Sequence, residues 1–209
     1  EHSAERLSFA HKSIINYYDP PITINYSAQN DGWSSGHEKF AKAMNDRKYP
    51  LYLYWGPFGH ANNHARIMQV NDLINSFDWL SIRKNKAYAV FSNASCNDKL
   101  PWPDNRSDKS SGQINAFFRW KIISDNLNQI TLSLYLTDPN ALKTKFPIPR
   151  EATADISIRR IQNMKVAPGD ALNWHYGKLK GKVKAGPWGL ITIPKLAISV
   201  NPKTLTIEK

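Results

Sequence analysis

The sequence is poor in three features that would narrow the class of protein at once. It has one cysteine, Cys96, in 209 residues, which excludes an internal disulfide framework and a cysteine-rich metal site. No apolar run approaches the ~20 residues that a membrane-spanning helix needs. Acidic residues are also scarce, since 17 Asp and Glu stand against 28 Lys and Arg and give a net charge of +11. The chain is nevertheless long enough to bury a sizeable core.

The positive charge is concentrated in one part of the chain. Residues 1–84 hold 9 basic and 8 acidic residues, whereas residues 85–209 hold 19 and 9, a balance of +10. The hydrophobic periodicity changes at the same place. We therefore predict two domains, 1–84 and 85–209. Because the chain starts at Glu1 with no signal-peptide pattern, we expect a processed product or a fragment of a longer protein.

The first part predicts an α/β arrangement. The run Ile22–Ser27 reads as a strand, Gly36–Asp46 as a helix and Pro50–Trp55 as a second strand, with further helices expected over 3–16 and 62–77. A connection of more than twenty residues between the strands indicates a parallel pair with a crossover helix. Polar residues that follow the carboxyl ends of such strands lie where open α/β sheets carry their sites.

Two motifs after these strands resemble those of the α/β-hydrolase superfamily, particularly its esterase and prolyl-oligopeptidase-like members. They are Asn30-Asp31-Gly32-Trp33 and the run from Tyr54 to His60, YWGPFGH. The resemblance implies that the fold is the C-terminal part of a hydrolase sheet and that Asp31 and His60 are the acid and base of a catalytic triad. In the family order serine, acid, histidine, the nucleophile would then lie upstream of Glu1.

Other interpretations of the same stretch stay open. Gly32-Trp33-Ser34-Ser35-Gly36 matches the G-x-S-x-G elbow, but only 26 residues separate Ser34 from His60, so Ser34 is the weaker candidate nucleophile. His60 and His64 are spaced like helical metal ligands, but no glutamate follows His60 and no third ligand is evident. We predict no metal and no cofactor. An aspartate in a turn is also commonly a turn former.

From residue 86 the apolar residues alternate with polar ones, as in half-buried strands. Seven or more short strands with turn signals between them predict an antiparallel β-sandwich of the immunoglobulin-like type. The predicted strands are Ala87–Phe91, Ile114–Ile122, Ile130–Leu136, Asp155–Ile161, Leu172–Tyr176, Leu179–Lys184, Leu190–Ile193, Ala197–Val200 and Thr204–Ile207.

A row of alternating lysines stands out in this second part. Lys178, Lys180, Lys182 and Lys184 would share one face of a strand, either to deter edge-to-edge pairing or to attract a polyanion such as an acidic polysaccharide. Nucleic acid is the less favoured partner, because no nucleic-acid-binding signature is present. Trp102 and Trp188, which lie next to prolines or glycines in loops, are candidates for sugar stacking.

Two functions follow from the sequence. The first is cleavage of an ester or peptide bond in a small-molecule or polymer substrate, in which this chain supplies Asp31 and His60 and needs the missing N-terminal region. The second is a non-catalytic basic β-sandwich module that binds carbohydrate or another polyanion. For either function we expect an extracellular or periplasmic protein without a membrane partner.

Overall fold

The computed structural model describes most of the chain. The described residues are 19–31, 36–57, 59, 71, 74–78, 81–101, 111–138, 140 and 147–209. Strands account for 46% of the residues, and they form three sheets. The predicted helix over 3–16 and most of that over 62–77 lie outside the described residues.

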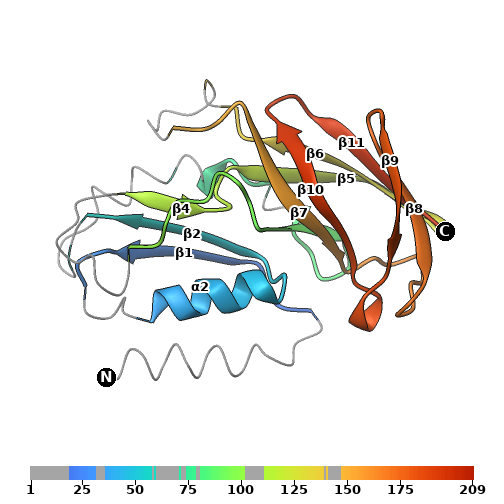
Figure 1. Ribbon diagram of the computed structural model, residues 1–209, viewed down its shortest axis with the longest axis horizontal. Helices are drawn as coiled ribbons and strands as arrows, with labels where there is room; N and C mark the ends of the chain where they lie inside the picture. The colour runs from blue at the N-terminus through green and yellow to red at the C-terminus, as the bar shows by residue number, and fades with distance from the viewer. Residues whose placement is uncertain are drawn as a thin grey trace.

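The first sheet is a small mixed sheet with the strand order β1-β2-β4 (Figure 1). Strands β1 (Thr23–Ala28) and β2 (Leu51–Gly56) run parallel and are connected through helix α2 (His37–Asp46). These elements lie within one residue of the predicted ranges. Strand β4 (Gly112–Ile114) comes from the basic second part of the chain and pairs antiparallel with β2.

Strand β2 is buried on both of its faces, which explains its continuous apolar sequence. Leu53 and Trp55 belong to a small cluster with the apolar side of α2. Tyr52 and Tyr54 point the other way and join the main core. Alternation of side chains along β2 therefore connects the mixed sheet to the rest of the molecule.

The remaining strands are antiparallel and form a three-stranded and a five-stranded sheet. The order of the first is β10-β7-β3 and that of the second is β5-β6-β11-β8-β9 (Figure 1). In chain order they are β3 (Tyr88–Ser92), β5 (Phe118–Asp125), β6 (Gln129–Leu136), β7 (Glu151–Arg159), β8 (Ala171–Tyr176), β9 (Leu179–Lys184), β10 (Ile191–Ser199) and β11 (Lys203–Glu208).

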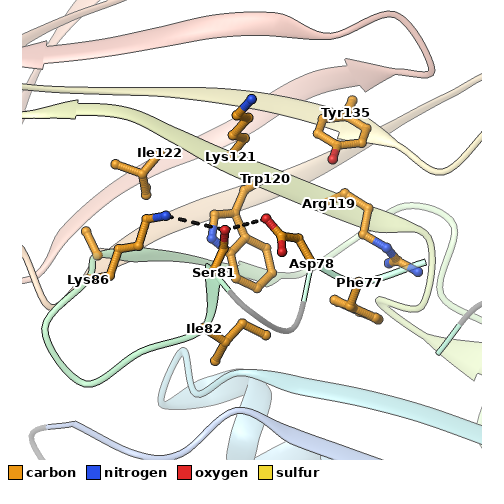
Figure 2. A pocket seen from close by; sticks show the side chains of 11 residues that line it. Phe77, Asp78, Ser81, Ile82, Lys86, Arg119, Trp120, Lys121, Ile122 and Tyr135 are labelled. Carbon is orange, nitrogen blue, oxygen red and sulfur yellow. Dashed lines mark hydrogen bonds between the residues drawn. The ribbon is translucent and has the colours of Figure 1, made fainter. Parts of the chain in front are cut away.

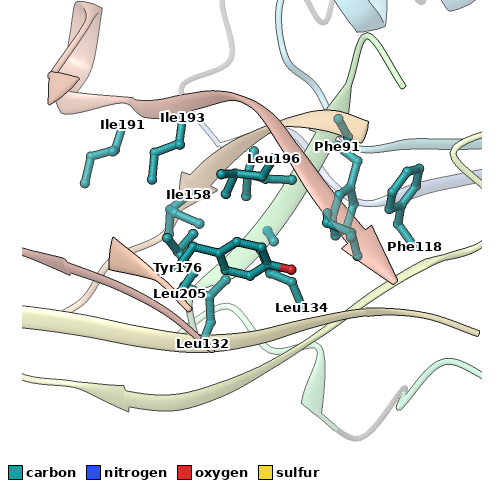
Figure 3. Close-up of a cluster of buried hydrophobic side chains, with 14 of the residues drawn as sticks. Phe91, Phe118, Leu132, Leu134, Ile158, Tyr176, Ile191, Ile193, Leu196 and Leu205 are labelled. Atoms are coloured by element: carbon teal, nitrogen blue, oxygen red, sulfur yellow. The ribbon is translucent and has the colours of Figure 1, made fainter. Parts of the chain in front are cut away.

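The two larger sheets share the main hydrophobic core. Figure 3 shows Ile158, Ile191 and Ile193 of one sheet near Leu132 and Leu205 of the other. All five side chains are almost fully buried. This arrangement is compatible with the predicted β-sandwich.

The predicted α/β class is wrong, and so is the recognition of the chain as the C-terminal part of an α/β-hydrolase. Among the described residues, α2 is the one complete α-helix, and the fold is predominantly β. The strand–helix–strand pattern correctly indicated the parallel pair β1–β2. It could not show that the next neighbour of β2 would be the short antiparallel strand β4. A local pattern does not define the remaining neighbours in a sheet.

A second correction concerns the strand predicted over Ile114–Ile122. The alternation of apolar residues is present, but the chain leaves the mixed sheet after Ile114 and enters the five-stranded sheet at Phe118. The break lies at Asn115, which has a left-handed backbone with φ of 57°. Asparagine tolerates this conformation better than most residues with a side chain.

Asn115 also joins two of the sheets through hydrogen bonds. Its side-chain nitrogen donates to the carbonyl oxygens of Leu51 on β2 and Phe91 on β3, at 3.1 and 3.0 Å. Its backbone nitrogen donates to the side-chain oxygen of Asn97 at 2.7 Å. Asn115 is only 3% exposed, so these bonds form where little water can replace them.

Arg159 makes a second connection between the sandwich and α2. Its guanidinium donates to the carbonyl oxygens of Arg47 and Lys48, at 3.2 and 3.1 Å. These carbonyls follow the last turn of the helix, where the backbone has no partner within the helix and where a cation is favoured. A basic residue of β7 therefore closes the C-terminal end of α2.

We expect Asn115→Ala to lower the free energy of unfolding by about 3 kcal/mol. Loss of the two donors leaves buried carbonyls unsatisfied at about 1 kcal/mol each, and alanine adds about 1 kcal/mol for the left-handed backbone. Asn115→Gly should lose only the hydrogen-bond contribution of about 2 kcal/mol, because glycine adopts the left-handed backbone readily. Urea denaturation measures both, with exposed Asn173→Ala as the control, expected within about 0.5 kcal/mol of the parent. Equal stability of Asn115→Ala and the parent would contradict this role.

Candidate binding surface

Of the predicted acid–base pair, only Asp31 is among the described residues. Asp31 follows β1 in a turn, where its backbone nitrogen donates to the carbonyl oxygen of Ala28 at 3.3 Å. The end of β2 lies alongside, because the backbone nitrogen of Gln29 donates to the carbonyl oxygen of Gly56 at 2.9 Å. His60 and Ser34 lie outside the described residues. The triad therefore stays a prediction without a described geometry, and the hydrolase resemblance that motivated it is not upheld by the fold.

A different histidine lies beside Asp31. Ser27 Oγ and His37 Nδ1 are 2.5 Å apart, and the charge of Asp31 acts on the same imidazole. Burial lowers the pKa of His37 by disfavouring its charged form, and the Asp31 carboxylate offsets part of this effect. Ser27 is only 3% exposed, so a substrate cannot reach its hydroxyl in this conformation. The contact holds the first turn of α2 against the end of β1.

A small hollow of about 20 Å³ lies beside the edge strand β5 (Figure 2). Phe77, Asp78 and Ser81 lie on one side, and Arg119 and Lys121 come from the strand. The Ser81 hydroxyl donates to Asp78, which lowers the pKa of that carboxyl. Because polar groups of the hollow already bind one another, we assign it no ligand.

The sequence pattern gives the wrong burial for one residue of this hollow, Arg119. It falls on the polar side of the alternation, yet it is only 3% exposed. Its guanidinium lies 3.6 Å from the centre of the Phe77 ring and donates to the carbonyl oxygens of Ala116 and Phe118, both at 2.7 Å, and to the Ser76 hydroxyl at 2.6 Å. No motif in the sequence signals these partners, because they come from backbone and from a distant segment.

The predicted lysine row lies on the hairpin formed by β8 and β9. Lys180, Lys182 and Lys184 occupy alternate positions of β9 and are all exposed, whereas Lys178 lies in the turn before the strand. Strand β9 is at the edge of the five-stranded sheet. The three strand lysines therefore form one exposed basic row, which we call the β9 lysine row.

The surroundings of the β9 lysine row contain few acidic groups. Across the ladder, Lys180, Lys182 and Lys184 are opposite His175, Asn173 and Ala171. Two acids close to this hairpin lie near other basic residues: Glu208 is 3.5 Å from His175, and Asp170 is 3.4 Å from Lys209. In the described part of the chain, no carboxylate lies within ion-pair distance of the three lysines.

Comparison with protein-family models, with curated proteins and with solved structures finds no match for this chain. Within the described ranges, no three metal-ligating side chains gather in one place, and no helix has the length and apolarity needed to cross a membrane.

We expect the pH dependence of stability to report the burial of His37. Its lowered pKa means that the unfolded chain binds a proton more readily than the folded chain. The resulting stability is fully present above the unfolded pKa of about 6.5 and is lost as the pH falls below that value. His37→Gln should flatten the change in unfolding free energy between about pH 7.5 and 5. An NMR titration that placed the His37 pKa above its ordinary value would contradict this interpretation.

Proposed function

We propose that this protein is a polyanion-binding β-sandwich module that uses the β9 lysine row as its main contact. The observation that carries the proposal is three exposed lysines in one row without an ion-paired carboxylate among the described residues. The balance of +10 over residues 85–209 favours approach of a negatively charged polymer to this part of the chain.

The spacing of the row supports an extended ligand. Alternate residues on a strand are about 6.8 Å apart, which is less than the screening length of about 8 Å at physiological ionic strength. Neighbouring ammonium groups therefore repel one another in the free protein. A linear polyanion that lies along β9 relieves this repulsion and releases bound counterions, so its affinity should fall as salt rises.

Protection of the sheet edge is the competing explanation of the same lysines. Charged side chains on an edge strand deter pairing with another chain. This role requires charge at the edge but does not require that neighbouring acids be absent or already paired. The two roles make different predictions for ligand binding when the row is neutralised.

We expect Lys180→Gln/Lys182→Gln/Lys184→Gln to weaken binding of heparin, a general polyanion probe, by about tenfold or more. Three exposed charge contacts of about 0.5 kcal/mol each amount to roughly a tenfold change in affinity. Isothermal titration calorimetry at low and high salt measures the change, and the salt dependence of the affinity should decrease with it.

A variant with the same loss of charge provides the control. Lys39→Gln/Lys42→Gln/Lys195→Gln removes three exposed lysines from α2 and β10 and keeps the net charge equal to that of the first variant. It should retain nearly the parent affinity. If both variants lose affinity equally, binding depends on net charge alone and the β9 lysine row is not a site. If the parent does not bind heparin at low salt, the proposed function is wrong.

A further inference from the structure

Trp188 lies in an unusual loop directly after the β9 lysine row. It belongs to the short 3₁₀ turn η4 (Pro187–Gly189), and its side chain is 55% exposed. Its backbone is left-handed, with φ of 59°. A bulky aromatic residue seldom adopts this conformation, because its Cβ crowds the neighbouring carbonyl. More than half of the Trp188 surface is nevertheless open to solvent, so part of the ring is accessible to a ligand.

The surrounding backbone holds this turn in place. Gly186 donates to the carbonyl oxygen of Leu190 at 2.9 Å, and Gly189 donates back to Gly186 at 3.1 Å. Gly189 is itself left-handed, and a Cβ at that position would lie 2.1 Å from the carbonyl oxygen of Val166. The loop therefore packs tightly on the segment that contains Val166, and these contacts hold the backbone that carries the tryptophan ring in place.

A hollow of about 160 Å³ lies next to the ring. Trp188 lines it together with Met164, Lys165, Val166 and Arg160. This volume is below the roughly 300–1,000 Å³ of complete small-ligand sites, so the hollow can hold only one part of a larger ligand. The hollow offers one broad aromatic side chain and nearby cations, in a part of the molecule that is open to solvent.

The three cations that line the hollow differ in their availability. Arg159 is only 5% exposed and donates to the carbonyl oxygens of Arg47 and Lys48. The Arg160 guanidinium contacts Asp19 at 2.6 Å and donates to the carbonyl oxygen of Arg83 at 2.9 Å, so its charge is largely compensated. Lys165 is exposed, and its ammonium donates to the carbonyl oxygen of Gln162 at 3.1 Å. Two protons of this ammonium remain for other acceptors. A carboxylate on a ligand would meet Lys165 at the border of the hollow.

The hollow and the β9 lysine row are close along the chain and in space. Trp188 follows Lys184 by four residues. The Lys184 side chain lies 3.7 Å from the Cβ position of Gly169, and Gly169 donates to the carbonyl oxygen of Ala185 at 2.8 Å. The loop that contains Gly169 begins with the residues that line the hollow. A polymer that lies on the row can therefore extend toward Trp188.

We infer that the hollow beside Trp188 is a sugar subsite and that the polyanion is an acidic polysaccharide. This inference rests on the proposed function. The C–H face of a pyranose ring is apolar and flat, and it stacks on an indole ring, whereas its carboxylate pairs with lysine. A polymer of phosphates has no such apolar face and gains nothing from the tryptophan.

Trp188→Asn tests the subsite without threatening the fold. Asparagine accepts the left-handed backbone, so the variant should melt at or above the temperature of the parent. We expect its affinity for polygalacturonate to fall about tenfold, the loss of roughly one stacked ring, with about twofold or less change for inorganic polyphosphate. Leu127→Asn removes an even more exposed apolar side chain from the β5–β6 turn and should change neither affinity.

The outcomes separate the two proposals. Loss of polygalacturonate binding alone supports the sugar subsite. If Trp188→Asn binds both polymers like the parent while the β9 lysine variant does not, the subsite is wrong and the polyanion-binding function stands. An equal loss for both polymers would also overturn the subsite, because it would show a role for Trp188 that does not depend on the sugar. If the parent binds neither polymer, the proposed function fails and the subsite fails with it.

Discussion

The rest of the structure depends on one buried amide. Asn115 lies where the chain passes from the mixed sheet to the five-stranded sheet, and its side chain donates to carbonyls of β2 and β3. Strands β2 and β3 belong to different sheets, so one side chain bridges the mixed and the three-stranded sheet at the point where the chain continues into the five-stranded sheet. A hydrophobic residue at this position would satisfy neither carbonyl and would not readily adopt the left-handed backbone. At this position, hydrogen bonding by a short amide side chain is therefore more important than the volume that the side chain fills.

The sequence predicts local elements well and their partners less well. The β1–α2–β2 unit and the β8–β9 hairpin follow from periodicity and turn residues, which act over a few positions. Sheet membership depends on contacts between distant segments. The alternation across Ile114 and Phe118 is continuous in sequence, yet these residues belong to different sheets. The two predicted strands on either side of Pro194 are one bulged strand, β10, for the same reason.

The sequence likewise locates one part of the candidate site and not the other. The β9 lysine row is a period-two pattern on one strand, so the sequence alone locates it. The Trp188 hollow requires Val166 and Lys165 to lie beside η4, and that contact comes from a loop more than twenty residues earlier. Its one local sign is a tryptophan between proline and glycine. The exposure and the left-handed backbone of Trp188 become visible only in three dimensions.

The positive charges of this protein are of two kinds, which composition cannot distinguish. Arg119 and Arg159 are buried, and each donates to backbone carbonyls at a strand break or a helix end. These two arginines stabilise the fold, and their charged groups lie inside the protein. The lysines of β9 are exposed and project from an edge strand whose acidic neighbours are already paired. Only this second kind is available to a ligand. The net charge of the chain therefore overstates its attraction for polyanions, and the location of the β9 lysine row, rather than the total, is the basis for assigning a binding function.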